Sequence, residues 1–347
     1  MWNFLIRINK NLVYAIPGLM AAGFIFGLAA AAEPVNRLKS FIVPLTFLMV
    51  YPMMITLNIK HLSAGIKNFR LQFTAQAINF LVIPFVAFGL GLIFFPGRPY
   101  LALGLLLAAL LPTSGMTISW TGFAAGNLGA AINMTIIGLT LGSIAAPFYV
   151  QVLMGAKVEV NLLLVAKQIA FIVFLPMLLG FFTQHLLVSR YGEARFKKIW
   201  APRFPSLSTI GVLGIVFVAL ALKARSIAAD PGILFHILLP VLGIYAINFS
   251  LSTMVGKVLF NRGDAIALVY GTVMRNLSIA LAIAINAFGT RGADTALVIA
   301  LSYIVQVQSA AWYVRLTDKI FGPAAHDFHA GPGSPPEKIQ MQSRRIG

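Results

Sequence analysis

Residues 100–127 read YLALGLLLAALLPTSGMTISWTGFAAGN, an apolar segment of membrane-spanning length with a polar interruption near its middle. Pro112 removes a backbone donor and clashes with the preceding helical turn. Gly115 adds backbone freedom, and hydroxyl groups stand at Thr113, Ser114 and Thr117. We predict a locally unwound helix whose free backbone groups face a cavity. The alternative is a continuous, proline-kinked helix in which the hydroxyls bond their own carbonyls.

A second interruption lies in DAIALVYGTVMRNLSIALAIAINAFG (264–289), where Thr272, Arg275, Asn276 and Ser278 break an apolar run. Arg275 follows Asp264 by about a dozen residues, which is deep in a bilayer at 1.5 Å per helical residue. An arginine keeps its charge in a protein and costs at least a few kcal/mol in hydrocarbon, so it must face protein or water. Two interpretations remain open: a fixed cation at a transport site, or a structural arginine that bonds carbonyls of a broken helix or a buried carboxylate.

The composition supports a membrane protein around these two segments. Hydrophobic residues make up 59% of the 347 residues, charged residues only 10%, and the mean hydropathy is +0.89. A soluble domain usually carries about 25% charged residues, so lipid must be the solvent for much of this chain. Long continuous apolar runs predict helices rather than a barrel. The fold class predicted is therefore an all-α integral membrane protein.

Ten segments are long and apolar enough to span a bilayer, each of roughly 20 residues. They cover residues 12–32, 39–59, 71–95, 100–121, 128–154, 160–188, 206–223, 232–257, 264–288 and 294–316. With ten spans both termini share one side, and the loops on that side hold most of the Lys and Arg residues. The positive-inside rule then puts both termini in the cytoplasm. We predict a multi-pass protein of the cell (inner) membrane.

The two interrupted segments are the fourth and the ninth of ten, so they hold corresponding positions in two halves, 1–155 and 156–320. Five spans per half is an odd number, so the halves would insert with opposite orientation. Paired interrupted helices in inverted repeats indicate a transporter's midplane site. The polar, Gly- and Pro-rich stretch 321–347 predicts a disordered cytoplasmic tail.

The candidate substrate-binding residues are those of the two interruptions. They are Pro112, Thr113, Ser114, Gly115, Met116, Thr117, Thr272, Arg275, Asn276 and Ser278. Other polar residues within spans, among them Asn79, Asn248 and Gln306, either line the same cavity or bond neighbouring helices. The chain has no cysteine, no phosphate-binding G-x-x-x-x-G-K-[ST] loop and no constellation of acid, base and nucleophile. We predict no enzyme activity, no cofactor, no metal and no nucleic-acid partner.

Three segments, YPMMITLNI (51–59), LLPTSGMTISWTGFAAGN (110–127) and GTVMRNLSIALAIAINAFG (271–289), resemble the bile acid/arsenite transporter superfamily. The arsenical-resistance permease branch is the more similar, and the resemblance covers essentially residues 5–320. It implies ten helices in two inverted five-helix repeats. The first, second, sixth and seventh helices would form a panel domain, and the rest a core domain whose two broken helices cross at the substrate site. Transport would move the core against the panel.

Three departures from the family pattern affect the function that the resemblance implies. Arsenite permeases carry a cysteine where this chain has Thr113 and tend to carry a glutamate where it has Ser278. The sodium-coupled branch has a neutral cation-coordinating residue where this chain has Arg275. We hypothesise that Arg275 replaces the coupling cation, or binds an oxyanion or a carboxylate, because a fixed positive charge in a low-dielectric cavity favours an anion.

The leading prediction is a secondary active transporter that exports arsenite or a related oxyanion by proton exchange. One alternative is a sodium-dependent or sodium-independent transporter of organic anions. An alternative of another class is a membrane receptor or scaffold that does not transport. The predicted partners are the lipid bilayer, a small inorganic or organic anion, and a coupling proton or no coupling ion, rather than sodium.

Overall fold

The computed structural model describes residues 11–56, 68–156, 158, 162–289 and 291–323. Every regular element within these residues is a helix. Seven helical stretches, some of which run through a 3-10 or π turn, are long and apolar enough to cross a membrane, judged by length and composition. The predicted all-α, multi-pass membrane architecture is therefore confirmed. The predicted tail lies, beyond its first residues, outside the described part of the chain.

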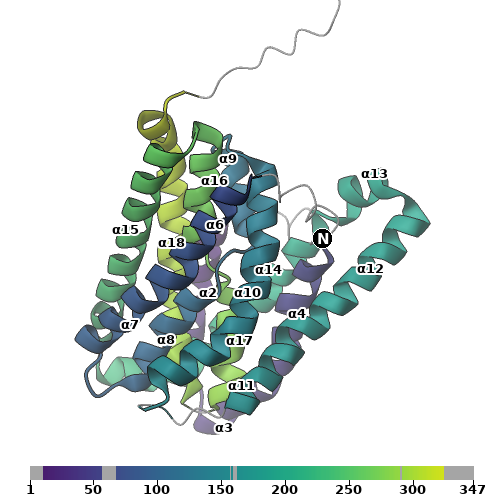
Figure 1. Cartoon of the computed structure of the whole chain (residues 1–347). Coiled ribbons are helices and arrows are strands. Elements are labelled where there is room, and N and C mark those ends of the chain that lie inside the picture. Colours follow the sequence, from purple (N-terminus) through teal and green to yellow (C-terminus); the bar gives the residue numbers. More distant parts are fainter. Residues whose placement is uncertain (1–10, 57–67, 157, 159–161, 290, 324–347) are drawn as a thin grey trace, which may run out of the picture.

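The described residues of the first half of the chain contain eight α-helices, and those of the second half form a further series of helices (Figure 1). The first set is α2 (Leu12–Ala29), α3 (Ala32–Arg37), α4 (Ile42–Ile55), α6 (Phe69–Ala77), α7 (Ile83–Phe94), α8 (Pro99–Leu110), α9 (Gly115–Phe123) and α10 (Leu128–Met154). The second set is α11 (Leu162–Ile169), α12 (Leu175–Tyr191), α13 (Glu193–Arg195), α14 (Arg203–Ala229), α15 (Gly232–Leu259), α16 (Arg262–Val273), α17 (Leu277–Phe288) and α18 (Gly292–Phe321). A 3-10 turn η1 (Leu38–Phe41) and the π-helical turns η4 (Ile78–Val82), η5 (Ala170–Phe174) and η6 (Phe196–Trp200) continue neighbouring helices.

Helices occur at each of the ten predicted segments, but two of these segments are split in the middle. The fourth consists of α8 and α9, and the ninth consists of α16 and α17. None of these four helices exceeds 12 residues, which corresponds to roughly 18 Å of rise. A half-helix of that length cannot cross a hydrocarbon core of about 30 Å, so each segment must use both halves.

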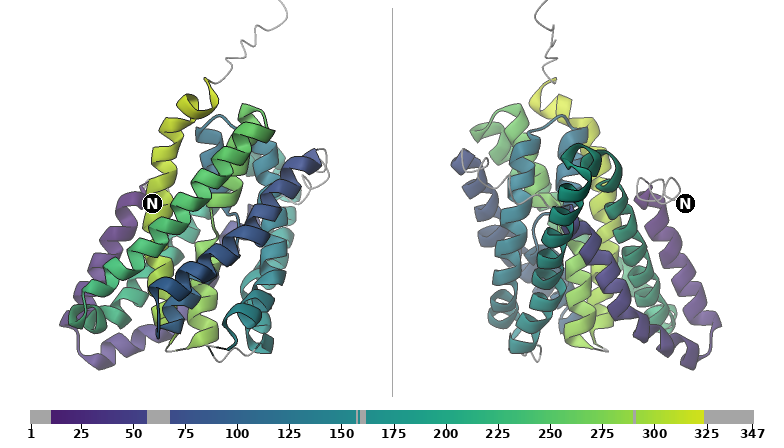
Figure 2. Two further views of the ribbon diagram at one scale, coloured as in Figure 1. Left: turned by 60° about the vertical axis from the view of Figure 1, so that its left-hand side comes forward. Right: turned by 90° about the vertical axis from the view of Figure 1, so that its right-hand side faces the viewer.

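The long helices pack in two groups, which Figure 2 shows from two further sides. In one group α14 lies along α2 and α4, and α12 lies along α4. In the other group α7, α8, α15, α16, α17 and α18 pack on one another, with α10 against α8 and α9. Small residues permit the close approaches: a Cβ atom on Gly211 of α14 would lie 2.4 Å from the backbone nitrogen of Met49 in α4. A Cβ atom on Gly104 of α8 would likewise lie 2.7 Å from the backbone oxygen of Thr295 in α18.

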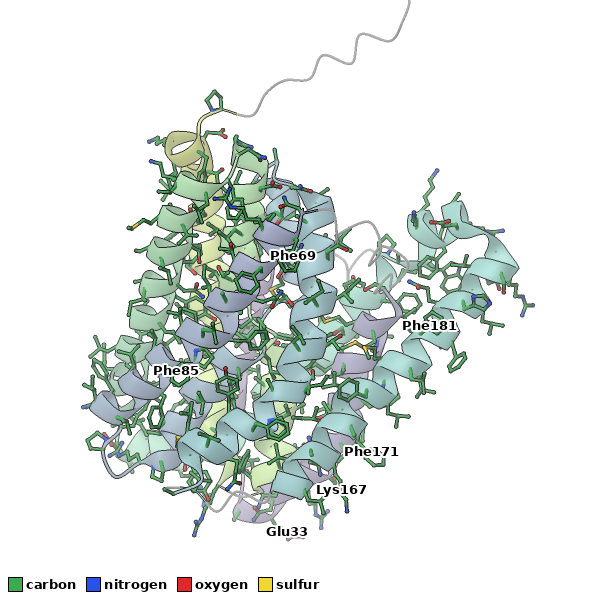
Figure 3. All side chains as sticks on the ribbon, in the orientation of Figure 1. Glu33, Phe69, Phe85, Lys167, Phe171 and Phe181 are labelled. Atoms are coloured by element: carbon green, nitrogen blue, oxygen red, sulfur yellow. The ribbon has the colours of Figure 1, made fainter. Side chains whose placement is uncertain are left out.

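Large apolar side chains cover the outside of the bundle. Figure 3 labels Phe69, Phe85, Phe171 and Phe181 on four helical segments of the bundle, and all four side chains are exposed. Exposed aromatic and aliphatic side chains on this scale are unfavourable in water and favourable in hydrocarbon. The outer surface therefore agrees with a bilayer as its solvent.

Candidate substrate site at the helix crossing

The two interruptions lie against each other at the middle of the second helix group. α8 and α16 approach from opposite ends of the bundle, and α9 and α17 leave toward opposite ends (Figure 1). The amide of Thr113 donates to Met274 O at 2.8 Å, and the amide of Asn276 donates to Leu111 O at 2.8 Å. Pro112 and Arg275 thus face each other in a single antiparallel bridge. The unwound residues satisfy each other's backbone groups, which hydrocarbon could not do.

The restart of the first broken segment is built from its own residues. Ser114 is the N-cap of α9: its Oγ accepts from Met116 N at 3.2 Å, while its own amide donates to Thr117 Oγ1 at 3.1 Å. Thr113 has φ of +66°, a left-handed conformation that is unusual for a β-branched residue. The Thr113 hydroxyl lies 2.6 Å from Pro112 O and 3.1 Å from Thr135 O of α10. Its side chain is therefore engaged inside the bundle.

The restart of the second broken segment leaves a donor unused. Asn276 is the N-cap of α17, and its Oδ1 accepts from Ile279 N at 3.2 Å. The Asn276 Nδ2 group is buried and has no hydrogen-bond partner among the described residues. The N-termini of α9 and α17 meet at this crossing, and both carry the positive end of a helix dipole. A buried amide donor beside two positive helix ends favours an anion or another acceptor-rich ligand.

Arg275 is buried, with 3% of its surface exposed, and it points toward the C-terminal end of α8. Its Nη1 donates to Ala109 O at 3.1 Å, where a cation complements the negative end of a helix dipole. Nη2 has no partner among the described residues. A cavity of about 10 Å³, lined by Arg275, Tyr245, Asn248 and Ser302 among others, adjoins the guanidinium. That volume is on the order of one water molecule.

One glutamine side chain holds the backbone of Arg275. The amide of Arg275 donates to Gln306 Oε1 at 2.8 Å, and Gln306 Nε2 donates to Arg275 O at 3.2 Å. The Tyr245 hydroxyl donates to the same Oε1 at 2.9 Å. Gln306 on α18 thereby replaces the helical partners that residue 275 lacks, since an unpaired buried backbone group costs about as much as a lost hydrogen bond.

Two asparagines satisfy the last carbonyls of α16. Asn79 Nδ2 donates to Gly271 O at 3.1 Å, and Asn248 Nδ2 donates to Thr272 O at 2.8 Å. The Thr272 hydroxyl bonds Ser252 Oγ at 2.6 Å. The sequence left open whether Asn79 and Asn248 line the cavity or bond neighbouring helices. Their hydrogen bonds are of the second kind, since both side chains donate to carbonyls of α16. Both side chains act on the broken helix itself.

The ten predicted site residues thus gather around one crossing, but their side chains face different ways. Thr113 faces α10, Thr272 faces α15, and Ser278 bonds the Tyr303 hydroxyl of α18. On another side, a Cβ atom on Gly115 would lie 3.3 Å from Met53 Cε of α4, so the start of α9 faces the other helix group. Within the described residues no group of three or more His, Asp or Glu side chains could hold a metal ion.

Sequence reasoning missed a cluster of three asparagines around the Asp264 carboxylate, at one end of the same helix group. The Asp264 carboxylate, 8% exposed, accepts from Asn68, Asn127 and Asn261 at 2.8, 2.7 and 3.2 Å. Each of these asparagines also caps the helix that follows it, respectively α6, α10 and α16. The signal was present: asparagine is a preferred N-cap, and each one stands just before a predicted span.

Comparison with known proteins agrees with this architecture. The profile of the Sodium Bile acid symporter family matches residues 43–230. The uncharacterized protein YbaS of Bacillus subtilis is 25% identical over 209 residues, which is 60% of this chain and 67% of YbaS. The arsenical-resistance protein Acr3 of Corynebacterium glutamicum is 20% identical over 258 residues, 71% of this chain and 70% of that protein. Acr3 of Alkaliphilus metalliredigens is 21% identical over 207 residues, 56% of this chain and 57% of that protein.

These matches confirm the resemblance that the two interrupted segments suggest. The family is one of membrane transporters and not of enzymes, and its members move small anions with coupling ions. Because the family match spans more than half of the sequence, the chain belongs to the sodium bile acid symporter family and is a multi-pass secondary transporter.

Proposed function

We propose that this transporter moves a small anion, with arsenite or a related oxyanion as the first candidate, and that Arg275 is its built-in cation. The observation that carries the proposal is the buried guanidinium at the helix crossing, with one unpartnered nitrogen and no carboxylate in salt-bridge contact among the described residues. A fixed positive charge of this kind raises the affinity of a low-dielectric site for an anion. Two distantly related proteins carry the name arsenical-resistance protein.

The substrate, in this proposal, binds on the side of the crossing that faces α4. The positive ends of α9 and α17, the Ser114 hydroxyl and the unpartnered Asn276 Nδ2 supply the donors there. The guanidinium of Arg275 lies behind them, against the end of α8. It acts on the anion through its charge rather than by contact, in the place where a mobile coupling cation would otherwise act.

The coupling that follows is to a proton or to no ion, rather than to sodium. A guanidinium already neutralises the negative end of the α8 dipole. A second cation beside it would meet like-charge repulsion at short range. Within the described crossing, Ser278 stands where a carboxylate proton carrier would be expected, so a proton carrier would have to be the substrate itself.

The membrane arrangement proposed has ten crossings in two inverted repeats, residues 1–155 and 156–320, with both termini in the cytoplasm. The group of α2, α4, α12 and α14 is the panel domain and the remaining long helices are the core domain. The extensive packing of α14 on α2 and α4, and of α12 on α4, supports this division. Movement of the core against the panel would expose the crossing alternately to the two sides.

One ion pair between the two helix groups offers a test of this movement. Lys223 Nζ of α14 lies 2.7 Å from Asp294 Oδ1 of α18, and so it joins the panel to the core. Asn286 Nδ2 of α17 also donates to Thr46 Oγ1 of α4, at 3.4 Å. Because the chain has no cysteine, a Lys223→Cys/Asp294→Cys pair can be joined by a bifunctional methanethiosulfonate reagent without competing thiols. Cross-linking should stop transport and reduction of the linker should restore it; equal flux in both states would contradict movement at this contact.

A second candidate substrate is an organic carboxylate. The observation in its favour is the absence of any cysteine together with the inward-turned Thr113 hydroxyl. The site therefore offers no thiolate ligand for trivalent arsenic and no exposed hydroxyl at residue 113. A carboxylate needs only donors and positive charge.

Flux into proteoliposomes separates the candidates. Purified protein is reconstituted, and uptake of arsenite and of a panel of carboxylates is measured with and without sodium and with and without a pH gradient. We expect flux of one anion class in sodium-free buffer, and its loss in Ser114→Ala but not in Ser189→Ala, a matched change at the exposed end of α12. If neither class of anion is transported, and cells that carry Ser114→Ala keep the phenotype of cells with the wild-type protein, the protein is instead a receptor or scaffold.

A further inference from the structure

The end of α12 carries a dense group of basic and aromatic residues that the transport site does not use. Residues 190–203 read RYGEARFKKIWAPR and contain five cations and one carboxylate. They form the end of α12, the short α13, the π turn η6 and the start of α14. Figure 1 shows this corner, labelled α12 and α13, projecting beyond the rest of the bundle. We call residues 190–203 the basic corner.

A lipid-facing stripe of α11, η5 and α12 leads directly to the basic corner. Phe171, labelled in Figure 3, is exposed, and Phe182 and Leu186 are 59% and 65% exposed. Phe182, Leu186 and Arg190 are spaced four residues apart, so they lie on one helix face. Each step rises about 6 Å. The face changes from apolar to cationic at Arg190, which puts that side chain at the level of the lipid headgroups.

The aromatic rings of the basic corner hold its guanidinium groups in place. The Tyr191 and Trp200 rings have centroids 5.7 Å apart. The guanidinium groups of Arg190 and Arg195 lie 5.8 and 5.7 Å from the Tyr191 ring, and that of Arg203 lies 5.4 Å from the Trp200 ring. Tyr and Trp are the residues that favour the membrane interface. A cation–π contact uses the face of the guanidinium, so the N–H groups of Arg190 and Arg195 can still donate to other acceptors.

The remaining charges leave the corner strongly positive. Lys197 pairs with Glu193 at 2.7 Å, with both side chains more than half exposed. Lys198 is exposed and has no carboxylate in salt-bridge contact among the described residues. The single carboxylate therefore offsets one cation of five.

We propose that the basic corner binds the headgroups of anionic phospholipids, and that it fixes the end of α12 and α14 in the membrane surface. Phosphate oxygens accept from arginine and lysine, and basic side chains next to a spanning helix are attracted to an anionic leaflet. The apolar stripe that ends at Arg190 favours a lipid over a soluble acidic partner, because acyl chains can cover Phe182 and Leu186 while the headgroup meets the cations. This inference does not depend on the identity of the transported anion.

The test compares two variants of the full-length protein in neutral detergent. The first is Arg195→Gln/Lys197→Gln/Lys198→Gln in the basic corner. The matched control is Lys257→Gln/Arg315→Gln/Lys319→Gln, three exposed cations at the ends of α15 and α18. Native mass spectrometry gives the dissociation constants of phosphatidylglycerol and phosphatidylcholine. One basic side chain near an anionic lipid surface contributes about fivefold to binding, so the first variant should bind phosphatidylglycerol about 100-fold more weakly. The control cations lie apart on two helices rather than in one group, so the control should lose clearly less affinity.

A second measurement keeps the proposal testable if the triple variant does not fold. Brominated phosphatidylglycerol should quench the tryptophan fluorescence of the wild type more than that of Trp200→Phe, and brominated phosphatidylcholine should not. Equal phosphatidylglycerol affinity in the two triple variants, or equal quenching with and without Trp200, would overturn the proposal. Displacement of the lipid by an equal concentration of glycerol phosphate would also overturn it, because a soluble phosphate compound would then be the ligand.

Discussion

The two helix interruptions look alike in outline, but they are made by different means. The break at Leu111–Ser114 contains a proline, a residue with positive φ, and a capping box formed by Ser114 and Thr117. The break at Met274–Asn276 contains no proline, no glycine and no positive φ. There the backbone of Arg275 is bonded on both sides by Gln306.

The difference teaches that the first break is encoded locally and the second depends on neighbouring helices. Pro112 removes a helical hydrogen bond and clashes with the preceding turn whatever its surroundings, and the positive φ of Thr113 next to it completes the break. Pro52 and Pro147, without such a neighbour, lie inside unbroken helices. Residues 274–276 could continue a helix, so their unwound state needs partners that a straight helix would not use. Changes at the first break should therefore alter local strain, and changes around the second should alter the packing of α18 and α15.

Gln306→Leu should have the largest effect on stability. It removes three hydrogen bonds and leaves the amide and carbonyl of Arg275 and the Tyr245 hydroxyl buried without partners. An unsatisfied buried group costs about 1–3 kcal/mol, so we expect a loss of about 3 kcal/mol or more. Thermal unfolding in detergent measures it, with Gln308→Leu, which is less buried on the same helix, as control. Equal midpoints for the two variants would mean that the second break does not need Gln306.

Gly142→Ala should have an intermediate effect through the first break. A Cβ atom on Gly142 of α10 would lie 2.7 Å from Pro112 Cδ and 3.2 Å from Leu110 O. Overpacking at such a contact costs about 1–3 kcal/mol. Gly129→Ala in the same helix meets only Asn127 Oδ1 at 3.5 Å, and it should raise stability by up to about 1 kcal/mol. The two unfolding midpoints should move in opposite directions; a shared direction would contradict the close packing of α10 on Pro112.

The smallest effect is expected at Thr113, and its sign separates the two breaks. Thr113 has φ of +66°, so Thr113→Gly should be about 1 kcal/mol more stable than Thr113→Ala. Asn276 has φ of −84°, where glycine brings no relief, so Asn276→Ala should be at least as stable as Asn276→Gly. The four unfolding midpoints form one comparison. The same order at both residues would remove the distinction between a locally strained break and an unstrained one.

Much of the fold could be predicted because the apolar runs are long and the interruptions are chemically explicit. Pro112 and Gly115 mark the first break, and a charge deep in an apolar run marks the second. The exact ends were harder: the last span reaches Phe321 rather than 316, because polar residues such as Arg315 and Asp318 can extend a helix beyond the hydrocarbon. The division into two repeats and the panel and core domains stays a prediction.

The site was harder to predict because composition does not say which way a side chain points. Thr113 and Ser114 are adjacent hydroxyl residues, yet Thr113 bonds toward α10 while Ser114 caps α9. The positive φ of Thr113 causes this divergence. Likewise the partner of Arg275 is the carbonyl of Ala109 and not a carboxylate. No sequence pattern singles out one carbonyl within an apolar run.

The most direct test of the built-in cation measures anion flux in proteoliposomes carrying wild type or Arg275→Ala, with and without sodium or guanidinium ions. The wild type should transport equally in all buffers. Arg275→Ala should lose at least about 10-fold in flux, since a buried charge interaction of this kind exceeds 1.4 kcal/mol, and added guanidinium should restore part of it. Arg315→Ala, a change at the exposed end of α18, should behave as the wild type. Sodium-dependent flux in the wild type, or undiminished flux in Arg275→Ala, would contradict the account.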